Sequence, residues 1–389
     1  MTHRSSEWNE VHKRIAELLG SPDVTQRQLN GLGGGISSLS KAGTYSTILL
    51  SQCSLEYTFL QVGVEDGVAH MSGNCGNLTA AVGPYAVEIS LLVDQLRQHS
   101  ILDLTRGIRI NTQGRLYRYA VPATVELWNR NTDKIIRSTF WVSLDQRSSQ
   151  ERWNFEPRGH FEMPGVPGTG SEIRLQWLKP GGSKTTSTFP TGSASESVNV
   201  NGRTFAVSLV DVSNPGIFVD GRELGWDPSR KPTELDDNPD LMATLDQIRQ
   251  AGTKKMGLDP KKPSVPKIVM VFPSNSDDRH IDCQALSMGK AHKAVPGTLA
   301  MNLAAACQIP GTVPNMLART ANDGTVTIGH PTGTATIRAK VDGSNVDYVE
   351  ISRTARCLMR GTAYGMPSNY ECVPMKDEQI ERLKKTRQS

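Results

Sequence analysis

Two apolar helical segments, each opened by a turn of small polar residues, constrain the fold more than any other feature of the sequence. The first stretch is SGNCGNLTAAVGPYAVEISLL, residues 72–92, and the second is SMGKAHKAVPGTLAMNLAAACQIPG, residues 287–311. A helix that is apolar on most sides has to be buried. Strand-like runs flank both stretches, so we expect each helix to pack inside or against a sheet.

The strand-like runs fall into one set around each helix. The runs around the first helix are 44–50, 57–64, 107–112, 119–127 and 135–142; those around the second are 203–212, 217–221, 266–272, 325–330, 334–341 and 347–361. Their short connections favour mainly antiparallel pairing. Further helices are predicted at 7–19 and 239–252. The Gly/Ser/Thr-rich segment 180–202 is either a domain linker or a long hairpin tip, and the common pattern of the halves indicates two similar subdomains.

Composition narrows the classes of partner. The chain has 389 residues, enough for two domains, and a formal net charge of +4. Its basic residues form no stripe interleaved with aromatics, which argues against nucleic acid. It has no apolar run of the roughly 20 residues that cross a bilayer, and its polar start predicts a cytoplasmic protein. The six cysteines form no CxxC pair and the histidines do not cluster, so we expect reduced thiols and no metal site.

Cys75 lies between Asn74 and Gly76 at the mouth of the first apolar helix. Free amide hydrogens at a helix start favour an anion, either a thiolate or a bound carboxylate. A cysteine in this position can be a proton carrier or a nucleophile. The alternative is a small buried residue in a tight turn, which is a common use of cysteine.

The loop GLGGGISSLSK, residues 31–41, is the second candidate element. Ser40, not a glycine, stands directly before Lys41, so the loop is not a P-loop, and a lone glycine cluster is weak evidence for a dinucleotide site. Its exposed amides and Lys41 suit a carboxylate ligand, or a lysine that acts as a general base. A flexible surface loop with a solvated lysine is the alternative.

Other polar residues lie in turns and at the end of a strand. In SMGKAHKA, at the expected start of the second helix, His292 is either an anion ligand, a proton shuttle or a structural histidine. Asn214 in NPGIFVDG and His330 in GHPTG occupy Gly/Pro turns of a common composition. Arg353 and Arg356 face opposite sides of a strand; one could pair with a substrate, and an ordinary salt bridge is the alternative.

Taken together, seven stretches resemble the PrpF family, isomerases related in fold to diaminopimelate epimerase. They span about residues 18–365 in the expected order: GSPD (20–23), GLGGGISSLSK (31–41), FLQVGVEDGVAHMSGNCGNLTAAVGPYAVE (59–88), NPGIFVDGRELG (214–225), SMGKAHKAVPGT (287–298), GHPTG (329–333) and RTARCLMRG (353–361). The resemblance implies an α+β fold of two pseudo-symmetric domains, each a mainly antiparallel sheet curled around a central helix, with the active site in the cleft between them. We expect the domains at 1–190 and 191–389.

The resemblance also implies an activity: moving a double bond, or interconverting cis and trans forms, in an unsaturated di- or tricarboxylate such as aconitate or 2-methylaconitate. It implies proton transfer without a cofactor or metal. Lys41 and Cys75 fall on the family's catalytic positions. We expect the substrate to be bound by Gly34, Gly35, Ser40, Asn74, Gly76, Asn77, Asn214, Ser287, Met288, Gly289, His292 and His330. The expected partner is this small polycarboxylate; a homodimer is left open.

One departure from the family pattern keeps two alternatives open. Family members usually begin with a strand that carries a motif like RGGTSKG, whereas this chain opens with MTHRSSEWNEVHKRIAELLGSPD. A non-catalytic ligand-binding homologue is therefore one alternative. Insertions near 95–106 and 143–160 raise the other, a tautomerase or isomerase of a bulkier secondary-metabolite acid.

Overall fold

The structure is a computed structural model with two compact units. One unit consists of Met1–Ser40, Val62–Ala69 and Met359–Ser389; the other consists of Lys41–Gln61 and His70–Leu358. In the first unit, α1 (Thr2–Leu18) includes nearly all of the predicted helix 7–19 and begins five residues earlier. The residues that the structure describes are 2–19, 21, 41–50, 53–62, 67–71, 74–112, 116–145, 152–163, 166–262, 264–287, 289–319 and 323–362.

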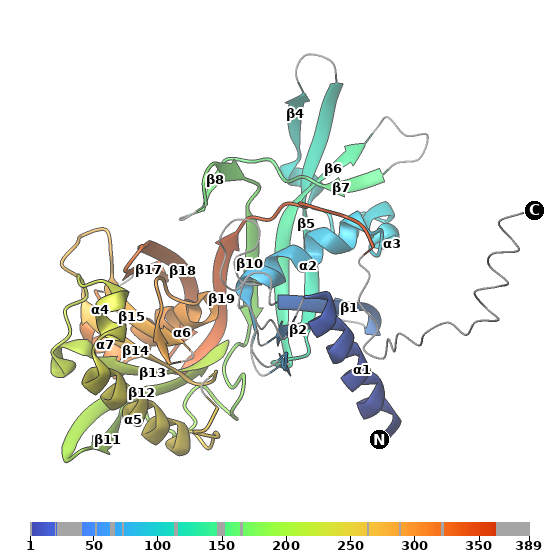
Figure 1. Cartoon of the computed structure of the whole chain (residues 1–389). Coiled ribbons are helices and arrows are strands. Elements are labelled where there is room, and N and C mark those ends of the chain that lie inside the picture. Colours follow the sequence, from blue (N-terminus) through green and yellow to red (C-terminus); the bar gives the residue numbers. More distant parts are fainter. Residues whose placement is uncertain are drawn as a thin grey trace, which may run out of the picture. The chain divides into compact units, whose positions relative to one another are not determined.

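One large sheet of 17 strands dominates the second unit (Figure 1). The strands of the first half are β1 (Lys41–Leu50), β2 (Cys53–Val62), β3 (Ala69–His70), β4 (Ile108–Thr112), β5 (Leu116–Asn129), β6 (Lys134–Asp145), β7 (Arg152–Phe155) and β10 (Ile173–Leu178). Those of the second half are β11 (Glu196–Val200), β12 (Arg203–Val212), β13 (Asn214–Asp220), β14 (Lys267–Pro273), β15 (Ile281–Ser287), β16 (Lys290–Ala291), β17 (Thr325–His330), β18 (Gly333–Asp342) and β19 (Asn345–Arg353). A separate pair is β8 (Phe161–Glu162) with β9 (Thr169–Gly170).

The strand pairings form one continuous path. It runs β1, β2, β5, β6, β10, β19, β18, β17, β15, β14, β13, β12, β11. Only the β2/β5, β13/β14 and β15/β17 pairs on this path are parallel, so the prediction of mainly antiparallel pairing is confirmed. β10 and β19 join the halves, with Ile173 opposite Arg353 and Leu178 opposite Tyr348.

The two apolar helices are α2 (Gly76–Glu88) and α6 (Gly297–Gln308). Every residue from Thr298 to Cys307 is buried, and α6 contacts β12, β13, β17, β18 and β19. α2 contacts β1, β6, β7 and β10 but leaves Tyr85 45% exposed, so it buries one face. One hydrophobic core contains residues of both helices, as the apolar pattern predicts.

A second core lies on the opposite face of β14. Ile268 and Met270 belong to it, whereas the alternating Val269 and Val271 belong to the core around α6. α5 (Pro239–Lys255) covers this second core and agrees with the predicted helix 239–252. The remaining helices are α3 (Val93–Arg97), α4 (Pro232–Asp236), α7 (Val313–Leu317), η2 (Leu104–Arg106) and η3 (Gly221–Leu224).

The segment between the halves is tied to β12. The Asp211 carboxylate accepts hydrogen bonds from the hydroxyl of Ser183, from the backbone N–H groups of Lys184 and Thr185, and from the Thr185 hydroxyl, at 2.5–2.9 Å. The hairpin tip lies further on, at Asn201 and Gly202 between β11 and β12. The domain boundary near residue 190 stays a prediction. Within the described ranges, no helix has both the length and the apolar character needed to cross a membrane.

Candidate active site

Cys75 caps the N-terminus of α2, as the sequence predicts, and a hydrogen-bond network centred on Asn74 fixes its backbone. The Asn74 Oδ1 atom accepts from the Cys75 N–H at 2.7 Å, from the Thr79 hydroxyl at 3.2 Å and from the Tyr57 hydroxyl at 3.3 Å. The Tyr57 and Thr79 hydroxyls lie 2.7 Å apart. Burial raises the pKa of Tyr57. The network therefore holds the backbone of the turn that carries the Cys75 thiol, and its groups stay neutral.

The neighbours of Cys75 have different surroundings. Gly76 is buried, and a Cβ there would lie 3.7 Å from the ring of Trp177. Asn77 is exposed and its Oδ1 accepts from Nε of Arg353 at 2.9 Å. Asn74 is only 8% exposed, and its Nδ2 atom has no hydrogen-bond partner among the described residues. A buried donor beside Cys75 is thus available to a ligand oxygen.

Lys41, the first residue of β1, shares an electrostatic environment with Cys75. Both act on Lys267, the first residue of β14. Burial is the main cause that lowers the pKa of Lys267 to about 8, Lys41 lowers it further and Cys75 opposes the shift. Lys267 and Lys41 in turn lower the pKa of His292, after the larger effect of its burial. These interactions bring Lys41, Cys75, Lys267 and His292 into one neighbourhood.

Lys267 is a candidate site residue that the sequence analysis missed. Its Nζ donates to the Ser264 carbonyl at 2.8 Å. In the sequence it opens the apolar run KIVMVF, and this isolated charge was the only available signal. In the structure, β13 pairs with β14 so that Gly216 lies opposite Lys267, two residues after Asn214. The pairing of β13 with β14, which are far apart in the sequence, brings Lys267 near Asn214.

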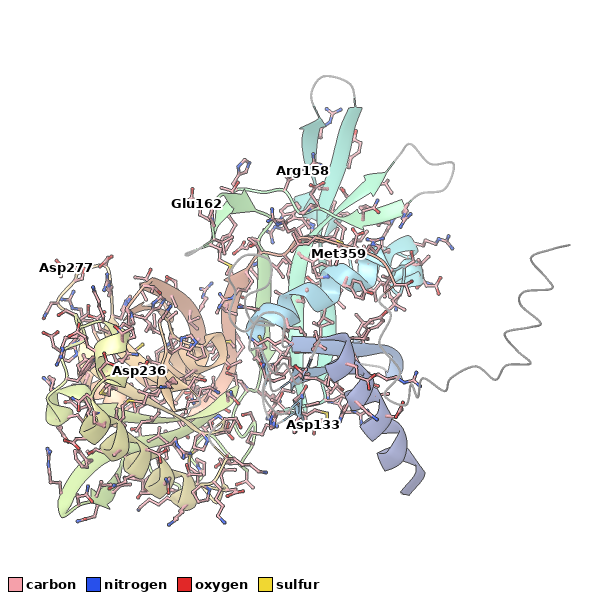
Figure 2. The ribbon with its side chains drawn as sticks, in the orientation of Figure 1. Asp133, Arg158, Glu162, Asp236, Asp277 and Met359 are labelled. Atoms are coloured by element: carbon pink, nitrogen blue, oxygen red, sulfur yellow. The ribbon has the colours of Figure 1, made fainter. Side chains whose placement is uncertain are left out.

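The segment from Ser287 to His292 is a correction to the sequence analysis. We expected it at the start of the second helix, but α6 begins at Gly297 with Pro296 as its N-cap. Ser287 instead ends β15 and pairs with Lys290 of β16, and Gly289 has the positive φ of 71° that favours glycine in such a hairpin turn. The carboxylate of Asp236 (Figure 2) accepts from the Ala291 N–H at 2.8 Å and fixes the hairpin to α4.

The two predicted histidines lie close enough to interact. The Nδ1 atom of His292 is 2.6 Å from the carbonyl oxygen of Ala294. Burial lowers the pKa of His330, and His292 contributes to the shift. The Thr332 hydroxyl donates to the Lys293 carbonyl at 2.9 Å, which holds the GHPTG turn against the segment after His292. Both rings are thus mainly neutral at pH 7.

Asn214 has a structural contact at the second apolar helix. The Asn302 amide of α6 donates to the carbonyls of Val210 and Asn214, at 2.7 and 2.8 Å. The Asn214 Nδ2 atom lies 3.4 Å from the Thr298 hydroxyl in the first turn of α6. Its Oδ1 atom is buried without a hydrogen-bond partner in the described part of the chain. Asn214 therefore stands beside the start of α6 with one unused acceptor.

Four predicted substrate-binding residues lie outside the described residues: Gly34, Gly35, Ser40 and Met288. Their roles stay predictions. Cys75, Cys283, Cys307 and Cys357 form no disulfide.

Arg353 connects the two halves beside Cys75. It ends β19, donates from Nε to Asn77 and from Nη1 to the carbonyl of Ser352, the latter at 2.8 Å. Burial lowers its pKa to about 10 and Cys75 opposes the shift. In the sequence analysis a salt bridge was the expected alternative for this arginine. Among the described residues it forms none.

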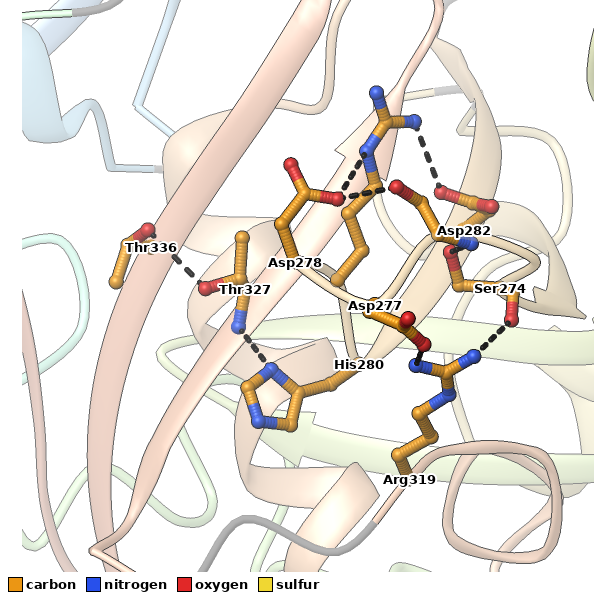
Figure 3. Close-up of polar contacts among 10 residues, drawn as sticks. Ser274, Asp277, Asp278, His280, Asp282, Arg319, Thr327 and Thr336 are labelled. Atoms are coloured by element: carbon orange, nitrogen blue, oxygen red, sulfur yellow. Dashed lines mark hydrogen bonds and ion pairs between the residues drawn. The ribbon is translucent and has the colours of Figure 1, made fainter.

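A charged cluster at the β14–β15 turn provides a contrast (Figure 3). There Arg319 pairs with Asp277 at 2.8 Å and Arg279 pairs with Asp282 at 3.4 Å. The backbone N–H of Thr327 donates to His280 Nδ1 at 3.0 Å. In this cluster both arginines have carboxylate partners, and the turn is held against β17. Lys267 and Arg353, near Cys75, have no carboxylate partner among the described residues.

A cavity of about 480 Å³ lies beside α5 and borders Lys267. Its lining residues come from α5, the following loop, β14 and the end of the β15–β16 hairpin: Met242, Asp246, Arg249, Gln250, Pro260, Lys261, Lys267, Ile268, Leu286 and Gly289. Lys267 and Gly289 connect the cavity to residues of the candidate site. Its walls combine apolar side chains with Lys261, Lys267 and an Arg249–Asp246 ion pair at 2.8 Å, so they leave room for an apolar substituent beside Lys267.

The fold and the site define a mixed α/β protein with a large, mostly antiparallel sheet and a cationic site that contains a lysine and a thiol. A family model described as PrpF protein matches residues 2–366. The chain belongs to the PrpF family.

Relatives and a solved structure agree with this assignment. The chain is 29% identical to a 3-methylitaconate isomerase of Eubacterium barkeri, over 90% of this chain and 89% of that protein. It is 30% identical to a 2-methyl-aconitate isomerase of Shewanella oneidensis, over 89% and 87%. It is similar to the crystal structure of a methylitaconate-delta-isomerase, with a TM-score of 0.70, 28% identity, and 92% and 91% of the two chains covered.

Proposed function

We propose that this protein is a cofactor-independent isomerase of an unsaturated di- or tricarboxylate of the aconitate or 2-methylaconitate type. The observation that carries the proposal is the shared neighbourhood of Lys41, at the start of β1, and Cys75, at the start of α2, both of which act on Lys267. Isomerases of such acids among the relatives support the substrate class. We also propose that the two halves are the pseudo-symmetric domains expected from the family resemblance. Cytoplasmic localisation stays a prediction.

The proposed reaction moves one proton and one double bond. A base removes a proton from the carbon next to the double bond, and the electron pair spreads over the allylic system into the carboxylate. The acid then returns a proton to the other end of that system, so the double bond shifts and the atoms balance. Lys41 removes or returns the proton, and Cys75 is the second acid/base or orients the substrate. Amide groups at a helix start and nearby cations stabilise the enolate-like charge.

Substitution of the two proton carriers tests these roles. Lys41→Ala and Cys75→Ser should each lower turnover of the best substrate by about 10²–10⁴-fold, the usual contribution of a positioned acid or base. Lys340→Ala and Cys357→Ser are matched controls, because Lys340 forms a surface ion pair with Asp347 and the Cys357 residue is exposed. Full activity in both site variants would refute the assignment.

The cavity favours a second candidate, an isomerase or tautomerase of a bulkier acid. A substituent on the substrate could enter the space beside Lys267 and Gly289. A series of 2-alkyl aconitates of increasing chain length separates the candidates. Increasing kcat/KM with alkyl length supports the bulkier substrate, and activity confined to aconitate itself rejects it.

A further inference from the structure

The Arg353 guanidinium lies against the first turns of both apolar helices. Its Nε donates to Asn77, the second residue of α2. A Cβ at Gly297, the first residue of α6, would lie 2.9 Å from its Nη2 atom. Within the described residues, Nη2 makes no hydrogen bond, so part of the guanidinium is left for a ligand. The amide groups of two helix starts add positive potential at the same place.

Lys267 is the first residue of β14, in the second half of the chain. It directly precedes Ile268, which belongs to the core covered by α5, and it also borders the cavity beside α5. Its Nζ uses one hydrogen bond on the Ser264 carbonyl. An ammonium has three donors, so two more remain for other acceptors. Strand pairing puts Lys267 opposite Gly216, two residues after Asn214, whose amide lies beside the first turn of α6. The charge of Lys267 also interacts with Lys41 and Cys75.

Neither cation has a carboxylate partner in the described part of the chain. Arginines elsewhere do: Arg137 pairs with Glu126 at 2.9 Å and Arg222 pairs with Asp220 at 2.7 Å. Lys267 and Arg353 are both half-buried, so each charge has lost part of its hydration without gaining a carboxylate partner. The unused, buried Nδ2 donor of Asn74 also lies next to Cys75. Two unmatched cations and a spare donor indicate an anionic ligand with more than one charged group.

We propose that Arg353 and Lys267 are specificity-determining residues that each bind one carboxylate of the same substrate, on either side of Cys75. This inference rests on the proposed function and deepens it, because it assigns the two charges of the substrate to named residues. The substrate carboxylate that Arg353 binds lies between the starts of α2 and α6. The substrate carboxylate that Lys267 binds lies on the β14 side. The substrate carbon atoms between these two carboxylates then face Lys41 and Cys75.

The experiment measures binding of a saturated acid that cannot react. Tricarballylate (propane-1,2,3-tricarboxylate) is titrated by calorimetry into the full chain. Glutarate lacks its central carboxylate and 2-methylsuccinate lacks a terminal one. The variants are Arg353→Ala, Arg353→Lys, Lys267→Met and Lys267→Arg, with Arg137→Ala and Lys340→Ala as surface controls.

Each neutralising variant should weaken tricarballylate binding by about tenfold or more, as expected for a lost charge-assisted hydrogen bond. The conservative variants should recover part of the loss, and the controls should bind as the wild type does. In the wild type, removing the ligand carboxylate that one of the two cations binds should weaken binding. In the variant that lacks this cation, the same change of ligand should have little further effect. A purely structural role of Arg353 does not produce this dependence on the ligand.

Two results of the titration would overturn the inference: no binding of tricarballylate to the wild type, or equal sensitivity of every variant to both truncations. If Arg353→Ala fails to fold, Arg353→Gln, which also removes the charge, replaces it in the same comparison. With a turned-over substrate, the variants should increase KM more than they lower kcat. Carboxylate-dependent binding without turnover of any unsaturated acid would reject the proposed function and keep this inference. Turnover of an unsaturated acid, with the same affinity in the variants as in the wild type, would support the proposed function and reject this inference.

Discussion

At the scale of residues, the central feature is the way buried polar groups hold Cys75. Asn74 accepts three hydrogen bonds through one oxygen, from the Cys75 backbone and from the Tyr57 and Thr79 hydroxyls. The sequence analysis selected Cys75 because it adjoins a helix start, and Asn74 through the family resemblance. It could not select Tyr57, because this residue lies on β2 and meets the turn only through tertiary structure.

Tyr57→Phe tests the supporting role of the hydroxyl. The ring is 1% exposed and remains in place, so only hydrogen bonds are lost. We expect the free energy of unfolding to fall by about 1 kcal/mol, measured by urea denaturation. Tyr119→Phe, at a tyrosine that is 43% exposed, should change it by less than about 0.5 kcal/mol. Equal effects of the two substitutions would argue against the network.

Lys267 gives a pH-dependent stability with a defined sign. Its pKa in the fold, about 8, lies below its ordinary value of 10.5. Between these two values the unfolded chain binds more protons at this residue than the folded chain. The contribution of Lys267 to the free energy of unfolding therefore increases as the pH rises through this window.

Thermal unfolding of the wild type and Lys267→Met between about pH 7.5 and about pH 10 measures this contribution. The stability of the wild type relative to the variant should increase across the window. A constant difference between the two proteins would mean that burial does not depress the pKa of Lys267.

At the scale of elements, regular patterns were predictable and short alternating ones were missed. The runs 203–212 and 325–330 coincide with β12 and β17. The strand β10, sequence IRLQWL, was not predicted although it alternates buried and partly buried residues. β15 was missed as well, and its hairpin with β16 was assigned to a helix start. The polar turn at 287–292 resembles the turn before α2, but Pro296 and Gly297 set the actual boundary.

Gly83→Ala tests the packing of α2 against β6. A Cβ at Gly83 would lie 2.6 Å from Cε1 of Phe140, which requires a shift of the ring. Overpacking costs about 1–3 kcal/mol, and the better helix propensity of alanine returns roughly 1 kcal/mol. We expect a net loss of about 1 kcal/mol in urea denaturation. Phe140→Leu should cost less in the Gly83→Ala background than alone; additive effects would reject the close contact.

At the scale of the whole molecule, the continuous sheet brings together residues that are far apart in the chain. β10 and β19 pair across about 175 residues of sequence, and Arg353 at the end of β19 then meets Asn77 of α2. Sequence alone supported the fold class, because two apolar helices among strands leave few arrangements. It also supported Lys41 and Cys75, through the resemblance. The roles of Lys267 and Arg353 depend on strand pairing, which no local pattern encodes.

The central claim is that Lys41 and Cys75 transfer a proton at a substrate carbon next to a carboxylate. Proton NMR of the purified protein with cis-aconitate, trans-aconitate and 2-methylaconitate in deuterated water tests it most directly. The account predicts new isomers, or entry of deuterium at a carbon next to the double bond, at a rate that Lys41→Ala and Cys75→Ser reduce. Binding of these acids without isomer formation or deuterium entry would contradict the account and favour a non-catalytic ligand-binding protein.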